Sequence, residues 1–229
     1  MLIVNYTVIT CDIIESRTLE QREQAQRHIE AAFGEINARF AADIAIPFQF
    51  TLGDEFQGVL TDLAKAPYIA GRLREEVAPV KIRIAIGFGE ITTELSEDIR
   101  KVDGPVFHIA RDVMEGLKRK QKKRGLKHKQ HLTGFASERG FDDTVDTVYM
   151  LYDVLISERT EKQWWAAKVY NLAGTATRAA AVFGTTFQNI SKQVNAAHLF
   201  ETNQAEQFLG HYLVSSSKGE PIGSPLRGS

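Results

Sequence analysis

Apolar and polar residues alternate or recur in regular patterns through the first part of the chain. Residues 6–14 are rich in β-branched and apolar side chains, which predicts a buried strand. Thr18 is a favourable N-cap for a helix over 19–40, where apolar residues recur at helical spacing. Two alternating runs, 48–52 and 56–60, flank a tight Gly-Asp-Glu turn and predict a β-hairpin.

The next hundred residues continue this mixture of strands and helices. The pattern predicts a helix over 63–76, a strand over 80–91, a helix from Pro105 into a basic run, a short strand near 131–135 and a helix over 142–156. The element order is β-α-β-β-α-β-α-β. It predicts an α+β domain over residues 1–157, with a ferredoxin-like or nucleotide-cyclase-like antiparallel sheet and helices on one face.

A change of composition after Ser157 predicts a small all-α domain over residues 158–213. Small, glycine and apolar residues fit the spacing of a helix-turn-helix: Ala180, Gly184, Ile190 and Val194. Its recognition helix, over 187–199, would present polar and aromatic residues to a DNA major groove: Thr186, Phe187, Gln188, Ser191, Lys192 and Asn195. A three-helix domain used for dimerisation or docking fits the same pattern. The Gly-, Ser- and Pro-rich stretch 214–229 predicts a disordered tail.

The composition is that of an ordinary globular protein, with 229 residues, 43% hydrophobic residues and a net charge of −1. No apolar run is long enough to span a bilayer, and the N-terminus lacks the pattern of a signal peptide, so we expect no membrane insertion. A single cysteine fits a reducing cytoplasm. The charge is uneven, because residues 117–131 carry eight Lys or Arg and no acidic residue. This run predicts either an anion-binding segment or a solvated helix end.

Acidic residues stand at two strand ends that the expected topology makes neighbours. Asp12 ends the first strand, and Asp54 and Glu55 lie in the hairpin turn, where we expect both to be exposed. Carboxylates placed in this way commonly hold Mg²⁺ against a nucleotide phosphate. Each residue alone is also explained as a turn residue or a solvated hairpin tip. Together they predict a nucleotide-polyphosphate site that uses Mg²⁺ or Mn²⁺.

At this pair the chain resembles the nucleotide-cyclase and GGDEF superfamily. The resemblance rests on Asp12-Ile13-Ile14, on Gly53-Asp54-Glu55-Phe56, on the strand ending Gly87-Phe88-Gly89-Glu90 and on the segment from Gly104 to Arg111. It implies a metal site formed by Asp12, Ile13 and Asp54. It also implies contacts to a nucleotide from a further set of residues: Glu15, Gly53, Glu55, Arg111 and Lys118.

The chain departs from that superfamily at the positions that serve cyclisation. Phe50 replaces the lysine that reads the base. The position of the transition-state asparagine falls on Phe107 when counted back from Arg111 and on His108 when counted forward from Gly104. Leu52 replaces the second glycine of GGDEF synthases. These changes predict a retained metal site without the apparatus for cyclisation.

Over nearly its whole length the chain is similar to the SatD family. The matching segments include residues 9–17 and 52–58, Asp103-Gly104-Pro105 and Thr160-Glu161-Lys162-Gln163-Trp164. Our leading hypothesis is a cytoplasmic DNA-binding regulator that senses a nucleoside triphosphate or cyclic nucleotide, with a homodimer as a possible assembly. The alternatives are an active two-metal nucleotidyl transferase, cyclase or phosphohydrolase acting on nucleoside triphosphates, and a non-catalytic adaptor.

Overall fold

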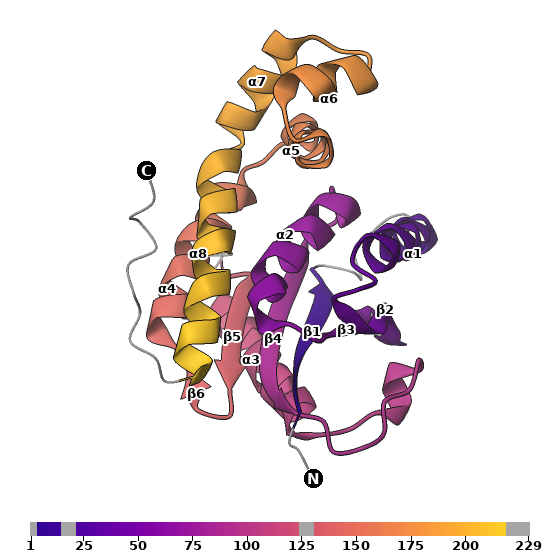
Figure 1. The fold of residues 1–229 in the computed structure, drawn as a ribbon, viewed down its shortest axis with the longest axis vertical. Helices are drawn as coiled ribbons and strands as arrows, with labels where there is room; N and C mark the ends of the chain where they lie inside the picture. Colours follow the sequence, from indigo (N-terminus) through magenta and orange to yellow (C-terminus); the bar gives the residue numbers. More distant parts are fainter. Residues whose placement is uncertain (1–3, 15–21, 124–130, 219–229) are drawn as a thin grey trace.

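The chain forms a mixed sheet with helices on both faces and a small helical unit beyond one end (Figure 1). The computed structural model describes residues 4–14, 22–123 and 131–218. The strands are β1 (Asn5–Ile13), β2 (Ile44–Leu52), β3 (Glu55–Leu60), β4 (Ile82–Glu90), β5 (Thr133–Ser137) and β6 (Gly140–Phe141). Among them run the helices α1 (Arg22–Arg39), α2 (Ala66–Val77) and α3 (Pro105–Lys123), and the 3₁₀ turns η2 (Leu63–Lys65) and η3 (Ile99–Lys101). The chain then continues through α4 (Asp143–Ser157), α5 (Glu161–Ala173), α6 (Ala176–Val182), α7 (Phe187–Ala196) and α8 (Leu199–Lys218).

The strand order in the sheet is β2-β3-β1-β4-β5-β6. β1 lies between β3 and β4 and pairs antiparallel with both. The predicted hairpin is present as β2 and β3. The expectation of a purely antiparallel sheet is wrong at one pair, because β5 runs parallel to β4. A parallel neighbour requires a crossover connection, and α3 provides it.

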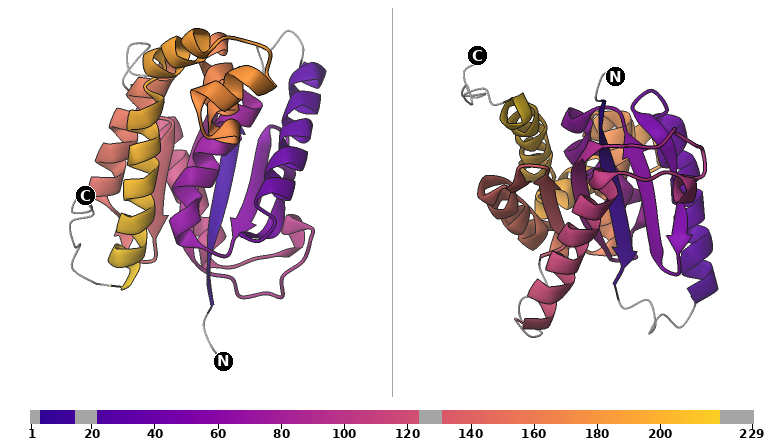
Figure 2. Two further views of the ribbon diagram at one scale, coloured as in Figure 1. Left: turned by 45° about the horizontal axis from the view of Figure 1, so that its top comes forward. Right: turned by 90° about the horizontal axis from the view of Figure 1, so that it is seen from below.

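The two faces of the sheet have separate apolar cores. On β1, Ile9 and Cys11 belong to the core beneath α1, α2, α4 and α8, whereas Val8 belongs to the core beneath α3. Alternation along a strand sends successive side chains to opposite faces. The prediction of helices on one face only is therefore wrong, because α3 covers the second face (Figure 2).

Gly87 lets α3 lie close against the sheet. A Cβ at this position would come within 2.8 Å of the Val106 carbonyl oxygen and 2.9 Å of the Ala110 nitrogen. From the sequence, this glycine could have served a ligand or a neighbouring element, and it serves the helix. α3 starts near the end of β4, where Gly104 lies against Glu90, and runs back along β4. Its later turns consequently reach the end of the sheet where β1 finishes.

The helical unit has its own small apolar core, to which α5, α6 and α7 contribute Val169, Ala180, Ile190 and Val194. Thr160, Thr175 and Thr186 cap the three helices through their side chains. Gly174 and Gly184 adopt positive φ in the two turns. The predicted recognition helix over 187–199 is present as α7, which begins at Phe187 and ends at Ala196.

The long helix α8 was not predicted from the sequence. It leaves the helical unit and runs back along α2 and α4 (Figure 1). Its Leu209 and Leu213 are buried in the core beneath α1 and α2. It continues to Lys218, so residues 214–218 of the predicted tail are helical. Residues 219–229 lie outside the described part. No helix within the described residues has the length and apolarity needed to cross a membrane.

Candidate functional site

Asp12 is a nearly buried carboxylate at the end of a central strand. It retains 5% exposure and faces α3, because the residues on either side of it, Cys11 and Ile13, point into the opposite core. In the β-ladders its partners are Glu55 on β3 and Arg83 on β4. Three charged side chains from three adjacent strands therefore stand in one row across the sheet.

Two cations neutralise the carboxylates in this row. Nη1 of Arg83 donates to Oδ2 of Asp12. The Nζ atom of Lys118, from α3, lies 3.2 Å from Asp12 Oδ1 and 3.2 Å from Glu55 Oε1. Burial lowers the pKa of Lys118, but the charges of Asp12 and Glu55 outweigh it and raise that pKa above its usual value. We call Asp12, Glu55, Arg83 and Lys118 the Asp12 cluster.

The hairpin turn brings Asp54 beside the end of β1. Gly53 has a φ of +65°, a conformation that glycine adopts without strain, so the two-residue turn Gly53-Asp54 closes tightly. The backbone N–H of Ile13 donates to the Asp54 carbonyl over 3.3 Å. Asp54 and Glu55 are half-buried, and it is Glu55 that stands opposite Asp12. The expectation of an exposed acidic pair at the tip is thus wrong for both residues.

The carboxylate oxygens of the Asp12 cluster are donor atoms of the type that a hard cation binds. Asp12 and Glu55 already share one positive charge, the ammonium of Lys118, which stands in for an ion. Carboxylate oxygens are the ligands that Mg²⁺ and Mn²⁺ prefer. Within the ranges that the structure describes, no three His, Cys, Asp or Glu residues gather closely enough to hold a metal ion. The predicted ligand Ile13 contributes its N–H to the turn and its side chain to the core.

Of the remaining predicted nucleotide residues, Arg111 is not brought into the cluster. Arg111 is exposed on α3, about 10 Å along the helix axis from Lys118. Glu15 lies outside the described residues. Of the basic run, Lys120 pairs with Asp146 of α4 at 2.7 Å, Arg119 is exposed, and everything from residue 124 to 130 falls in a part that is not described.

Sequence reasoning missed Arg83. It is a charged residue in an otherwise apolar strand, and this break in the pattern was the available signal. The two phenylalanines at cyclase positions lie in apolar packing. Phe50 packs on Phe33 and Phe56, with ring centroids 5.2 and 5.9 Å away, and Phe107 packs against the core beneath α3.

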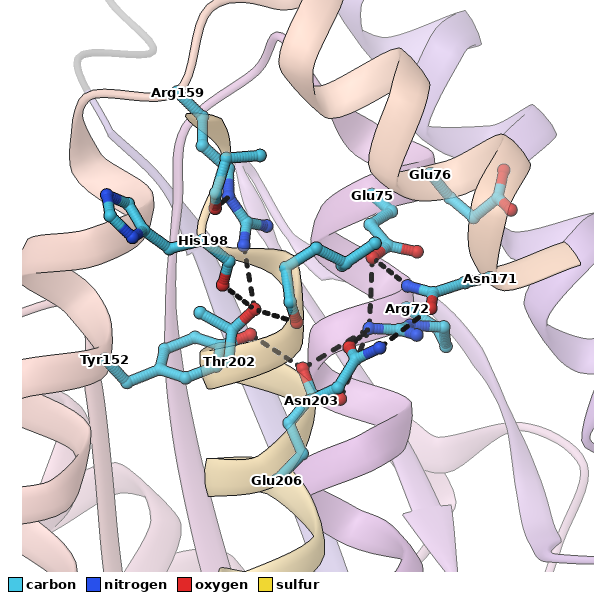
Figure 3. A network of polar contacts seen from close by, with 12 residues as sticks. Arg72, Glu75, Glu76, Tyr152, Arg159, Asn171, His198, Thr202, Asn203 and Glu206 are labelled. Atoms are coloured by element: carbon cyan, nitrogen blue, oxygen red, sulfur yellow. Dashed lines mark hydrogen bonds and ion pairs between the residues drawn. The ribbon is translucent and has the colours of Figure 1, made fainter. Parts of the chain in front are cut away.

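A second charged network, which the sequence did not predict, is buried between α2 and α8 (Figure 3). Nη2 of Arg72 lies 3.0 Å from Glu75 Oε1 and 3.2 Å from Glu206 Oε2. Tyr152 of α4 donates to Glu206 Oε1 over 2.8 Å. Burial raises the pKa of Glu75 to about 7 and also raises that of Glu206, while Arg72 opposes both shifts. We call these residues, with Asn171 and Asn203, the α2–α8 network.

This network also anchors the helical unit. Nδ2 of Asn171, on α5, donates to Glu75 Oε1 over 2.7 Å, and Nδ2 of Asn203 donates to Asn171 Oδ1 over 3.0 Å. One turn away, Lys168 pairs with Glu76 at 2.6 Å. The final turn of α2 therefore holds α5 through these polar contacts.

The residues predicted to contact DNA lie on and just before α7. Gln188, Lys192 and Asn195 are exposed, as is Phe187, and Ser191 is half-buried. The hydroxyl of Thr186 accepts a hydrogen bond from the Asn189 N–H and so caps the helix. Lys192 is the one charged residue of α7.

The model of the SatD family matches residues 6–168, and the chain belongs to this family. No curated protein matches the chain. The predicted family membership is confirmed, and the matched range holds the Asp12 cluster and ends within α5.

Three solved structures are similar in fold. The first is the catalytic core of a rhodopsin-guanylyl cyclase with converted specificity, in complex with ATPalphaS, at 20% identity and a TM-score of 0.39, covering 49% of this chain and 72% of the other. The second, the guanylate cyclase domain of RhGC from Catenaria anguillulae in complex with GTP, has 17% identity and a TM-score of 0.40, covering 48% and 72%. A bacterial light-regulated adenylyl cyclase has 13% identity and a TM-score of 0.40, covering 59% and 77%.

Proposed function

We propose that the chain binds a nucleoside triphosphate or a cyclic nucleotide, together with Mg²⁺ or Mn²⁺, at the Asp12 cluster. One observation carries the proposal. A nearly buried carboxylate ends a central strand with a second carboxylate, an arginine and a lysine in contact, beside the tight glycine turn of a hairpin. Carboxylates suit a divalent cation, and lysine and arginine suit phosphate oxygens.

Each group has a distinct role in this proposal. Asp12 and Glu55 would hold the cation, with Asp54 next to them in the turn. Lys118 and Arg83 would face the phosphate oxygens. A bound Mg²⁺ ion would neutralise part of the phosphate charge.

Binding is favoured over cyclisation by the apolar surroundings of two residues. Phe50 and Phe107 both pack on neighbouring hydrophobic side chains. Neither can donate a hydrogen bond to a base or to a developing negative charge, which cyclisation would need.

A short covalent path joins the Asp12 cluster to the helical unit. β4 begins at Ile82, one residue before Arg83, and residues 78–81 connect it to the end of α2. The last turn of α2 holds α5 through Glu75 and Glu76. A ligand that repositions Arg83 would in this way shift the last turn of α2 and, with it, the contacts that hold α5. The helical unit would then respond to ligand binding at the Asp12 cluster.

DNA binding by α7 is the second candidate function. It is favoured by the spacing of the α6–α7 turn, where Gly184 has a φ of +64° and Ala180, Ile190 and Val194 are buried together. Gln188 and Asn195 have the side-chain amides that read adenine edges, and Lys192 can reach guanine or phosphate. The small number of cations on this helix predicts low affinity and a shallow salt dependence.

A thermal-shift screen tests the nucleotide proposal. ATP, GTP and cyclic nucleotides are added with and without Mg²⁺, and product formation is followed by chromatography in parallel. A ligand at one hundred times its Kd stabilises the fold by about 2.7 kcal/mol, which is a shift of several degrees. A Mg²⁺-dependent shift without product supports binding without turnover. No shift with any nucleotide would overturn the proposal.

A further inference from the structure

We infer that Lys118 is a tethered cation that competes with a divalent metal ion for Asp12 and Glu55. This inference rests on the proposed function and concerns how the same site is controlled. The ammonium sits at equal distances, 3.2 Å, from Asp12 Oδ1 and from Glu55 Oε1. It thus occupies the bridging position between the two carboxylates.

The ammonium and a divalent ion cannot share these oxygens. Mg²⁺ binds carboxylate oxygen at about 2.0–2.1 Å and repels a neighbouring positive charge at such short range. A metal ion that takes Asp12 Oδ1 and Glu55 Oε1 must therefore displace the Lys118 ammonium. The exchange has a route, since 27% of the Lys118 side chain and 35% of the Glu55 side chain are exposed.

Arg83 holds the Asp12 carboxylate in place while the ammonium and the metal ion exchange. It binds Oδ2 of Asp12, whereas Lys118 binds Oδ1, so the two cations use different oxygens of one carboxylate. Without Lys118, the row Glu55–Asp12–Arg83 has a net charge of −1, which a divalent cation would compensate. Displaced from the carboxylates, the ammonium becomes available to the phosphates of an incoming nucleotide, so metal and nucleotide would favour each other's binding.

The test is a titration with Mn²⁺ alone, followed by electron paramagnetic resonance of the free ion. The protein is compared with Lys118→Met, which removes the charge and keeps the length of the side chain. We expect the variant to bind Mn²⁺ at least about tenfold more tightly than the unaltered protein. Lys120→Met is the matched control. It removes the same charge two residues further along α3, from a side chain that pairs with Asp146 instead. We expect it to leave the affinity for Mn²⁺ unchanged.

Two more variants complete the test. Lys118→Arg keeps the charge and holds Mn²⁺ binding near that of the unaltered protein, and Glu55→Gln in the Lys118→Met background removes the gain. Circular dichroism confirms folding, and Lys118→Gln takes the place of Lys118→Met if that variant does not fold. Equal affinity for Mn²⁺ in Lys118→Met and in the unaltered protein overturns the inference. The absence of Mn²⁺ binding to both proteins also overturns it.

The failure of the inference is distinguishable from that of the proposed function. The Mn²⁺ titration contains no nucleotide, and the thermal-shift screen measures nucleotide binding to the unaltered protein. A nucleotide shift together with equal Mn²⁺ affinities would overturn only the competition by Lys118.

Discussion

Asn171 of α5 donates its side-chain amide to Glu75 of α2 over 2.7 Å, across a separation of 96 residues in the chain. Glu75 is itself 5% exposed and pairs with Arg72 at 3.0 Å. The contact between the helical unit and the sheet domain therefore contains a buried carboxylate. Because burial penalises the charged form, this contact is sensitive to pH.

The stability of the fold depends on pH through Glu75. Its pKa lies at about 7 in the folded chain, above the ordinary value of 4.5. A carboxyl group with a raised folded-state pKa contributes its full stabilisation below the unfolded value and loses it as the pH rises through the folded value. We expect the melting temperature to fall as the pH rises from about 4.5 through about 7, and to fall less in Glu75→Gln. Calorimetry measures both profiles.

Glu158→Gln is the control for this experiment, because Glu158 is exposed at the end of α4 and lies outside the network. Its profile should follow that of the unaltered protein. Parallel profiles for Glu75→Gln and Glu158→Gln would show that Glu75 is charged in the folded chain throughout this range.

The docking of α8 on the sheet domain depends on Gly210. A Cβ there would come within 2.5 Å of the Ala64 carbonyl oxygen, so Gly210→Ala forces the helix away from η2. We expect a loss of about 1–3 kcal/mol in the free energy of unfolding, measured by urea denaturation. Gly116→Ala is the matched control within α3, since a Cβ there has nothing within 4 Å. It should gain about 0.5–1 kcal/mol. An unchanged free energy of unfolding in Gly210→Ala would contradict the packing of α8 against η2.

Local patterns in the sequence were sufficient for most elements and for placing Asp12 beside the hairpin turn. The strand ending in Asp12 and the turn at Gly53 follow from alternation and turn chemistry, which depend on neighbouring residues only. The helix α8 was missed because its buried face includes Glu206 and Thr202. Glu206 is buried against Arg72 and Tyr152, which lie 134 and 54 residues away in the chain.

The partners of Lys118 were likewise beyond the reach of local patterns. Its place in a basic run indicated binding to an external anion, yet in the fold it contacts Asp12 and Glu55. This contact exists because α3 crosses the second face of the sheet, close against Gly87. A crossover of this kind depends on the packing of whole elements, which no short stretch of sequence encodes.

The second candidate function predicts a DNA contact by α7. Lys192→Ala should weaken binding to genomic DNA fragments. It should also reduce the slope of log K against log salt concentration by about one, as expected for the loss of one phosphate contact. Lys162→Ala on α5 removes an exposed charge outside α7 and should leave binding unchanged. Electrophoretic mobility shifts at several salt concentrations measure both. Absence of retained DNA at low salt would exclude this function.

Isothermal titration calorimetry with the nucleotide that gives the largest thermal shift tests the central claim most directly. The titration is run in Mg²⁺ on the unaltered protein, on Glu55→Gln and on Lys120→Met. Glu55 is half-buried in the Asp12 cluster, so its loss removes a cation ligand and we expect at least about a tenfold weaker affinity. Lys120→Met should bind as the unaltered protein does. Equal affinity in all three proteins would place the nucleotide elsewhere and contradict the account.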